Sequence, residues 1–220
     1  MIDLSKHEKQ IYSQQGEDGI IQAILDEIGT TNKVAVEFGA LDDLTDNTLN
    51  LKNHGWKVYQ INGEQYTPSI HKAWMTAENC NDVFTELKIP KEFDVLSIDV
   101  DFNDYYIWEA LEYRPRLLVI EHNASIPPTE ARVVRYEPKR VWDGTNYFGA
   151  SLLALEKLGK KKGYSLVYVE SMGVNAFFVR DDCLTKNLTP KTSEEVYQLP
   201  KYGQGPNGGH IRSWEEMIEI

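Results

Sequence analysis

The sequence has few cysteines, and this excludes one class of protein at once. Only Cys80 and Cys183 occur among 220 residues, far apart in the chain and outside any CxxC pair. Small secreted domains that depend on disulfides carry many closely spaced cysteines, so a disulfide framework is excluded. The cysteine usage therefore predicts a reduced, cytoplasmic setting.

Long hydrophobic runs are also missing. No apolar stretch approaches the roughly 20 residues that a membrane-spanning helix needs. The first ten residues, MIDLSKHEKQ, contain no hydrophobic signal region. From these two observations we expect no membrane partner and, again, a cytoplasmic protein.

Basic charge is scarce. The 23 Lys and Arg residues are outnumbered by 34 Asp and Glu residues, which gives a formal net charge of −11 at pH 7. Proteins that bind nucleic acid need a basic surface to neutralise phosphates, so a nucleic-acid partner is not expected. A small-molecule substrate is the remaining prediction, and the sequence leaves open whether the chain forms a homo-oligomer.

Strand-like and helix-like segments alternate along most of the chain, which is typical of an α/β fold with a parallel sheet. The clearest predicted strands are residues 34–40, 57–64, 94–100 and 116–123, and the clearest predicted helices are 20–28, 105–111 and 149–162. Between residues 65 and 92 the pattern is weaker. There Tyr66, Ile70 and Trp74 suggest a helix, and Val83 with Phe84 suggests a short strand.

The last two strands have a special arrangement. Residues 164–170 and 175–180 are joined by only four residues, Ser171 to Val174. So short a connection cannot hold a crossover helix, and the pair is therefore predicted to be an antiparallel hairpin. We therefore predict a Rossmann-like, mostly parallel seven-stranded sheet with a C-terminal antiparallel hairpin. It would form one domain over residues 1–183, followed by a tail, 184–220, with a terminal helix near 213–218.

The first strand leads into a candidate ligand site. Residues 34–47, VAVEFGALDDLTDN, are typical of a buried strand, a glycine and an acidic loop before a helix. An open α/β sheet binds ligands at the carboxyl ends of its strands, and Gly39 would allow a close backbone approach. An acidic strand end suits hydroxyl groups or a cation and repels a pyrophosphate. The second strand ends in Asn62-Gly63-Glu64, where an acidic residue could take ribose hydroxyls.

A polar segment before the first long helix is a second candidate. Residues 13–18, SQQGED, have the right length to lie over the strand ends. The simpler interpretation is a helix cap, and the sequence alone does not choose between the two.

Acidic and polar side chains follow the two central strands, where we expect the chemistry. The residues that would converge there are Asp99, Asp101, Asp104, Glu121, His122 and Asn123. Oxygen ligands from adjacent strand ends suit Mg²⁺ or another divalent cation, with Asp99, Asp101, Glu121 and Asn123 as the predicted ligands. Without a metal, Asp101, Glu121 or His122 could act as a general base. Alternatively, some of these carboxylates cap helices or pair with Arg114 and Arg116.

Residues 124–148 form a long segment without a clear period, which predicts a lid or substrate loop. Its bases, Arg132, Arg135, Lys139 and Arg140, could hold an anionic substrate or lie in solvent. Its aromatic residues, Tyr136, Trp142, Tyr147 and Phe148, could stack on a sugar or a base, or could pin the loop to the core. Arg135, Tyr136, Trp142 and Tyr147 are the predicted substrate residues.

Several segments together resemble the FkbM-like S-adenosylmethionine (SAM)-dependent methyltransferases. They are SQQGEDGII, VEFGALDDLTDNT, GWKVYQINGE, FDVLSIDVDFNDYYIW, RLLVIEHN, YFGASLLAL, KGYSLV and NAFFVRDD, and they span about residues 12–182 in order. The resemblance implies a class I methyltransferase fold with SAM as methyl donor. It also implies O-methylation of a sugar, a nucleotide sugar or a glycan precursor, with a metal, where one is held, lowering the pKa of the acceptor hydroxyl.

Carried onto this sequence, the resemblance assigns residues to the cofactor. SAM would contact Glu37, Gly39 and the loop from Asp42 to Asn47. Its ribose would lie near Asn62 and Glu64, and its adenine near Asp99 at the end of the strand 94–100.

The chain departs from the family pattern at three positions. Asp43 and Phe102 stand where glycine is usual, and Asn62 stands where a carboxylate is usual. Asn62 would lose the strength of a charge-assisted hydrogen bond to ribose, and the bulk at Asp43 and Phe102 would narrow the pocket. These changes keep a second hypothesis open, namely an inactive methyltransferase-like binding module that has lost its affinity for SAM.

Overall fold

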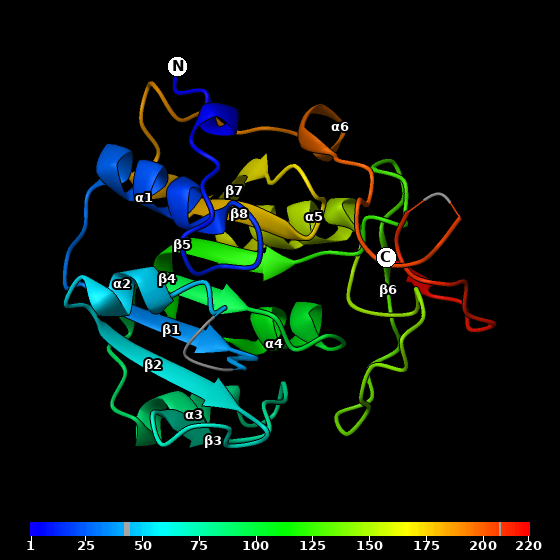
Figure 1. Ribbon diagram of the computed structural model, residues 1–220, viewed down its shortest axis with the longest axis horizontal. Coiled ribbons are helices and arrows are strands. Elements are labelled where there is room, and N and C mark those ends of the chain that lie inside the picture. Colours follow the sequence, from blue (N-terminus) through cyan, green and yellow to red (C-terminus); the bar gives the residue numbers. More distant parts are fainter. Residues whose placement is uncertain (42–44, 207) are drawn as a thin grey trace.

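The computed structural model describes residues 1–41, 45–206 and 208–220. Seven strands form one sheet in the order β3-β2-β1-β4-β5-β8-β7 (Figure 1). These strands are β1 (Val34–Phe38), β2 (Lys57–Asn62), β3 (Ile70–Lys72), β4 (Glu92–Ile98), β5 (Arg114–Glu121), β7 (Tyr164–Val169) and β8 (Asn175–Arg180). The helices are α1 (Glu17–Ile28), α2 (Leu49–Asn53), α3 (Cys80–Glu86), α4 (Asp104–Ala110), α5 (Leu152–Lys162) and α6 (Ser193–Val196).

One strand of this sheet runs against the others. β8 pairs antiparallel with both β5 and β7, whereas β1 to β5 are joined by parallel pairings. This order, with a reversed strand inserted next to the end, is the class I methyltransferase fold that the sequence predicts. The chain order reverses direction between β1 and β4, and such a switch point is where an open α/β sheet forms its ligand crevice.

Helices cover both faces of the sheet, because alternate residues of each buried strand point to opposite sides. On one face, Val36 and Leu96 pack with residues of α3, α4 and α5 such as Trp108. On the other face, Ala35 and Val95 pack with α1 and α2. Both faces of β1 and most of β4 are buried, which explains their nearly continuous apolar sequences.

The region between residues 65 and 92 corrects the sequence prediction. The expected helix around Ile70 is instead the short edge strand β3, whose Ile70 pairs with Gln60 of β2. The expected strand at Val83 and Phe84 is instead helix α3, which buries Cys80, Val83 and Phe84. These three positions have the i, i+3, i+4 spacing of one helix face, so a helical period was present but too short to recognise.

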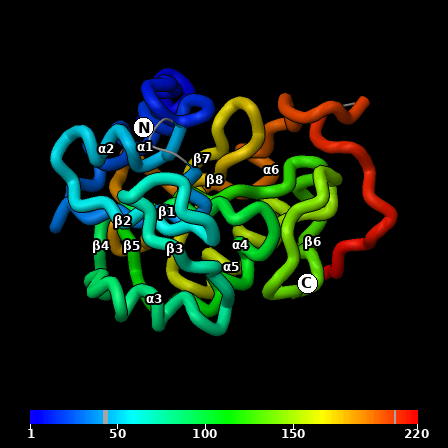
Figure 2. The backbone as a smooth tube through the Cα atoms, turned by 60° about the horizontal axis from the view of Figure 1, so that its bottom comes forward, coloured from blue at the N-terminus to red at the C-terminus, as the bar shows by residue number. Residues whose placement is uncertain are grey.

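The tail is also different from its prediction near the C-terminus. No helix forms at residues 213–218; instead β9 (Ile218–Glu219) pairs antiparallel with β6 (Arg132–Val133) of the lid segment. Figure 2 shows the last residues passing down the side of the molecule that the lid occupies and ending beside β6. Lid and tail therefore lie together beyond the carboxyl ends of β4 and β5 (Figure 1).

Candidate active site

Two cavities adjoin at the carboxyl ends of β1, β2, β4 and β5, on either side of the switch point. The larger has a volume of 350 Å³ and the smaller a volume of 130 Å³. Gly39, Leu41, Asp99 and Asp101 line both, so the two cavities meet above β1 and β4. The larger one lies within the size range of pockets that bind small molecules and cofactors.

The larger cavity has aromatic walls and a polar floor. Tyr66, Trp74 and Trp142 line it, together with Asn62 and Glu64 from the end of β2. The indole nitrogen of Trp74 donates a hydrogen bond of 2.6 Å to the carbonyl of Pro138 in the lid. The lid is thereby fixed to the segment that follows β3, and its residues Arg140, Val141 and Trp142 form part of the cavity wall.

Asn62 and Glu64, the predicted ribose ligands, differ in how firmly each side chain is already bound by other groups of the chain. The Asn62 amide donates to the carbonyl of Ala40 at 2.8 Å and accepts from the Glu64 amide at 3.1 Å. Both of its polar groups therefore stabilise the chain itself. Glu64 is exposed and forms an ion pair of 2.8 Å with Lys72, which a ligand can replace at little cost because such surface pairs are weak.

Glu37 organises the loop that follows β1. Its buried carboxylate accepts hydrogen bonds from the Asn47 amide at 2.7 Å and from the amide and hydroxyl of Thr48 at 3.0 and 2.5 Å. Burial, with a contribution from nearby Asp46, raises the pKa of Glu37 to about 8. Asn47 in turn donates to the Ser97 hydroxyl at 3.1 Å and so ties the loop to β4. Glu37 and Asn47 line the smaller cavity. Asp42 and Asp43 lie outside the described residues.

Gly39 is required by the packing of the chain. Its φ is +80°, and a Cβ atom at this position would lie 1.5 Å from the carbonyl oxygen of Asp99. Only glycine allows the ends of β1 and β4 to approach so closely. The glycine that the sequence assigns to ligand approach is therefore already needed to build the floor of the two cavities.

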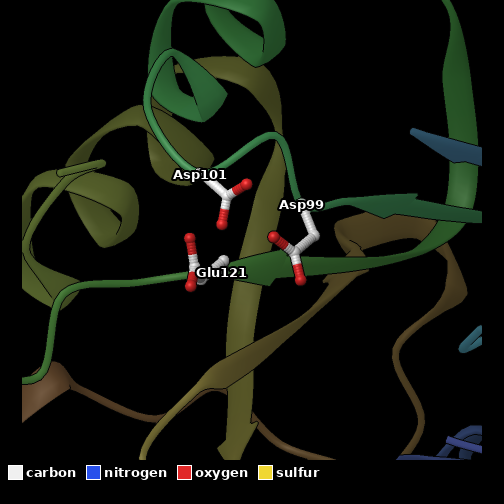
Figure 3. Close-up of side chains that lie close together, drawn as sticks. All are labelled: Asp99, Asp101 and Glu121. Atoms are coloured by element: carbon white, nitrogen blue, oxygen red, sulfur yellow. The ribbon is translucent and has the colours of Figure 1, made fainter. Parts of the chain in front are cut away.

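Three carboxylates from two strands meet at the centre of the site. Asp99 and Asp101 follow β4 and Glu121 ends β5, and one oxygen from each lies within 4.8 Å of the other two (Figure 3). We call these three residues the carboxylate cluster. Asp99 and Glu121 are half-buried, and Asp101 is exposed at the rim. The sequence predicted that these side chains would converge, and the structure brings them together.

The electrostatics of the cluster follow from burial and crowding. Desolvation raises the pKa of Asp99 well above its usual value, and repulsion from Asp101 and Asp104 adds to this. The pKa of Glu121 is raised for the same two reasons, first by desolvation and then by Asp99. Among the described residues, Glu121 Oε2 has no hydrogen-bond partner. Such a group either shares protons between its members or receives a cation.

Asp104 stabilises the turn that carries Asp99 and Asp101. Its carboxylate accepts a hydrogen bond of 2.8 Å from the amide of Val100, the residue between the two cluster aspartates. Burial raises the pKa of Asp104 to about 7. Asp101 has a φ of +64°, an unusual value for a residue with a side chain, and the Asp104 hydrogen bond holds the turn that imposes it.

His122 and Asn123 do not join the cluster, which corrects two expected roles. His122 is fully buried, its Nδ1 lies 3.0 Å from the Val174 carbonyl, and burial lowers its pKa to about 4. Asn123 donates to the carbonyls of Asn146 and Phe148 at 2.8 and 3.0 Å and accepts from Ser125 at 3.1 Å. Alternation along the strand end turns His122 away from Glu121, and Asn123 anchors the lid.

Of the four predicted substrate residues of the lid, only Trp142 reaches a cavity of the site. Trp142 lines the larger cavity. Tyr136 donates to Glu78 at 2.5 Å, and Tyr147 is buried and accepts from the Arg135 amide at 3.1 Å. These two tyrosines pin the lid to the domain, while the Arg135 side chain is exposed.

Arg140 is the basic lid residue that reaches the site. It lines the larger cavity, and its guanidinium lies 5.1 Å from the ring centres of both Phe102 and Tyr147. Phe102 is buried against Tyr147 and Val134 and is absent from the described lining of both cavities. The expectation that Phe102 narrows the pocket is therefore wrong.

Gln14, from the predicted polar segment 13–18, lines the smaller cavity, so that segment does lie over the strand ends. Sequence reasoning missed two other residues near the site. Asn175 lines the smaller cavity. His210, from the tail, packs its ring 4.4 Å from that of Trp142 and lies within the electrostatic reach of Asp101. The only available signal was the run of glycines around residues 203–209, which predicts a tight turn but no partner for it.

Comparison with known proteins finds a similarity among solved structures but none by sequence. No family model matches the chain, and none of the curated proteins is significantly similar to it. The fold is similar to the N-terminal domain of EvdMO1. That crystal structure contains bound SAH; the likeness has a TM-score of 0.46 at 12% identity and covers 76% of this chain and 80% of that one. The resemblance to the FkbM-like methyltransferases stays a prediction, and the chemistry of the site rests on the residues described above.

None of the described helices has both the length and the apolar character needed to cross a membrane.

Proposed function

We propose that the chain is a SAM-dependent methyltransferase that methylates a hydroxyl group of a small molecule, most simply a sugar or a glycan precursor. The observation that carries this proposal is the junction of the two cavities. A nucleoside-sized cavity opens directly onto three carboxylates at the switch point of a class I methyltransferase fold. Donor and acceptor would meet at this junction.

The lining of the cavities fits the chemistry of the proposed cofactor. Trp74 and Tyr66 offer flat apolar surfaces for an adenine, and Glu64 offers a carboxylate for ribose hydroxyls. Glu37, Asp46, Asp99, Asp101 and Glu121 line the smaller cavity, whose described lining contains no lysine or arginine. An acidic cavity favours the positive sulfonium and ammonium groups of SAM. When bound, SAM would supply an electrophilic methyl group.

The carboxylate cluster also fits a divalent cation. Asp99, Asp101 and Glu121 present hard oxygen atoms from adjacent strand ends, as Mg²⁺, Mn²⁺ and Ca²⁺ prefer. A cation would relieve the repulsion that raises the pKa values of Asp99 and Glu121. When bound, it would lower the pKa of the acceptor hydroxyl.

The residues themselves can position the acceptor and take its proton. Asp101 lies at the exposed rim, where an acceptor can reach it. Partial desolvation of its carboxylate raises the pKa of Asp101 above the usual value. A carboxylate with a raised pKa is a better base at neutral pH. Glu121, deeper in the site, could take the same proton if the acceptor enters further. Most of the rate enhancement would come from alignment of the hydroxyl with the methyl group.

The binding-module hypothesis remains the second candidate, and one observation favours it. Both polar groups of the Asn62 side chain are engaged by Ala40 and Glu64 of the same chain. Recognition of ribose would then depend on Glu64 alone, which weakens the expected affinity for SAM.

Isothermal titration calorimetry separates the two candidates. The protein is titrated with SAM and with SAH, each with and without Mg²⁺. Asp101→Asn is compared with Asp82→Asn, a control carboxylate exposed on α3. The methyltransferase proposal predicts micromolar binding that weakens at least tenfold for SAM in Asp101→Asn and is unchanged in the control. Absence of binding at millimolar SAM and SAH would reject the methyltransferase proposal and leave the binding module.

A further inference from the structure

The tail forms a compact turn against the chain that leaves β5. We call residues 202–206 and 208–211 the tail turn. Its backbone is closed by hydrogen bonds from the Gly209 amide to the Tyr202 carbonyl and from the Gly205 amide to the Gly209 carbonyl, both 2.7 Å. Gly203, Gly208 and Gly209 have positive φ values of 71–81°, so the turn has a backbone that few other residues could adopt.

The tail turn is packed tightly onto the chain that leaves β5. A Cβ atom at Gly209 would lie 2.7 Å from the Ser125 hydroxyl. Just before the turn, Tyr197 donates a hydrogen bond of 2.6 Å to the carbonyl of Ala124. Residues 124 and 125 follow the strand that ends in Glu121, so these contacts place the turn next to the cluster.

The His210 ring packs among aromatic side chains of the lid and of the tail turn itself. The His210 ring centre lies 4.4 Å from that of Trp142, 5.6 Å from that of Phe148 and 5.3 Å from that of Tyr202. These edge-on and tilted contacts fix the orientation of the imidazole. Among the described residues, no hydrogen bond to the His210 side chain is formed, and its charge interaction is with Asp101. The imidazole is thus held in place with its polar nitrogens available.

The charge of this region limits what can bind there. Asp99, Asp101 and Glu121 crowd the centre, and Glu37 and Asp46 line the cavity beyond them. Of the lid bases, Arg140 is paired with Glu215 and Arg132 with Glu130 at 2.7 Å. As long as no cation occupies the cluster, a phosphate group next to it would meet negative charge that, among the described lining residues, only the already paired Arg140 could offset. A neutral molecule with many hydroxyls would instead find acceptors on the carboxylates, a donor or acceptor on the imidazole and flat rings to stack on.

From these observations we infer that the tail turn and Trp142 form the acceptor subsite and that it takes an uncharged sugar, with His210 and Asp101 as its polar contacts. The reaction at this subsite depends on the proposed function, whereas the binding of an uncharged sugar does not. It narrows the acceptor from sugars and nucleotide sugars in general to uncharged sugars. It also makes the tail a part of the site.

Saturation-transfer NMR of the full chain tests the inference, because it detects millimolar binding of sugars. The probes are the methyl glycosides of glucose, galactose, mannose and rhamnose, compared with UDP-glucose, all in the presence of SAH. We expect saturation of the ring protons of at least one neutral glycoside. For UDP-glucose, saturation of its glucose protons should be at least threefold weaker.

Matched variants locate the binding. His210→Ala and Trp142→Ala should each lower the glycoside signal at least fivefold. His54→Ala, at an exposed histidine after α2, should leave it unchanged, as should Trp214→Ala, at a fully exposed tryptophan of the same tail. Circular dichroism confirms that each variant is folded, and His210→Gln should restore part of the signal because its amide can still hydrogen-bond.

Three results would overturn the inference. They are stronger binding of UDP-glucose than of every neutral glycoside, loss of the signal in Trp214→Ala but not in His210→Ala, and no glycoside signal at all. These outcomes are distinguishable from failure of the proposed function. The calorimetric titration reports on SAM alone, and glycoside binding without SAM binding would retain the subsite while rejecting the methyltransferase.

Discussion

At the scale of single residues, several positions that resemble ligand contacts are first of all needed by the fold. Glu37 holds three donors of the loop before α2, and Asn62 holds one donor and one carbonyl of its own chain. Gly39 has no space for any larger residue. A side chain of the expected type at the expected place therefore does not by itself identify a ligand contact.

Gly39 provides a direct test at this scale. Gly39→Ala should destabilise the protein by more than about 3 kcal/mol or prevent folding, because a positive φ and a backbone clash add together. Gly29→Ala is the matched control, since Gly29 has a similar φ of 74° but a Cβ atom there would have no neighbour within 4 Å. With a ψ of 172°, its backbone is one that residues other than glycine rarely adopt, so this change should cost about 1–3 kcal/mol. Urea unfolding measures both, and equal losses would contradict the close packing of Gly39 against Asp99.

At the scale of elements, the lid and the tail support each other. β6 of the lid pairs with β9 of the tail, and the Ile220 amide donates to the Ala131 carbonyl at 3.0 Å. Arg140 forms a two-pronged ion pair with Glu215, one contact of which measures 2.8 Å, and it also covers the rings of Phe102 and Tyr147. The cover of the larger cavity is thus built from two segments that are far apart in the sequence.

Arg140 should therefore control the order of this cover. Arg140→Ala should make the lid at least threefold more susceptible to limited proteolysis, since both the ion pair and the stacking are lost. Glu215→Ala should have a smaller effect. A double-mutant cycle should give a coupling of about 0.5–1 kcal/mol, because the pair is partly exposed. A coupling near zero would mean that Arg140 acts through the rings and its pairs with Glu137 and Asp143 instead.

Helices and strands could be predicted from the sequence where the repeating pattern of apolar residues extends over enough residues. The repeated apolar spacing of α1 and the apolar runs of β4 and β5 leave little choice. β3 and α3 were exchanged because β3 has three residues and α3 has seven, too few for a period to be seen. The pairing with β2, a tertiary contact, decides that Ile70 belongs to a strand.

At the scale of the whole molecule, buried carboxylates gather at one edge of the sheet. The pKa values of Glu37, Asp99, Asp104 and Glu121 are all raised, in each case mainly by burial. The folded state therefore binds protons that the unfolded chain has already released above about pH 4.5. Linkage then requires that the free energy of unfolding falls as pH rises through the raised pKa values of about 7 and 8 for Asp104 and Glu37.

The pH dependence of stability tests this arrangement. We expect the melting temperature to be highest near pH 5 to 6 and to fall steadily toward pH 8.5. Glu37→Gln, which cannot lose a proton, should flatten the decline above pH 7, although it lowers the overall stability by about 1–3 kcal/mol through an altered hydrogen-bond set. Addition of Mg²⁺ should raise the melting temperature at pH 8 more than at pH 5. A melting temperature that rises with pH would contradict the raised pKa values.

The sequence by itself determined the order of strands and helices outside residues 65–92, the lid and the tail, and it also determined the hairpin and the convergence of Asp99, Asp101 and Glu121. Periodicity, loop length and strand alternation are local properties, and parallel strands must present their carboxyl ends at one edge. Only the tertiary structure decided that His122 and Asn123 turn away, that Asn62 is engaged and that His210 reaches the site. These outcomes depend on which segments pack against each other, and no local pattern in the tail specifies its contact with residues 124–125.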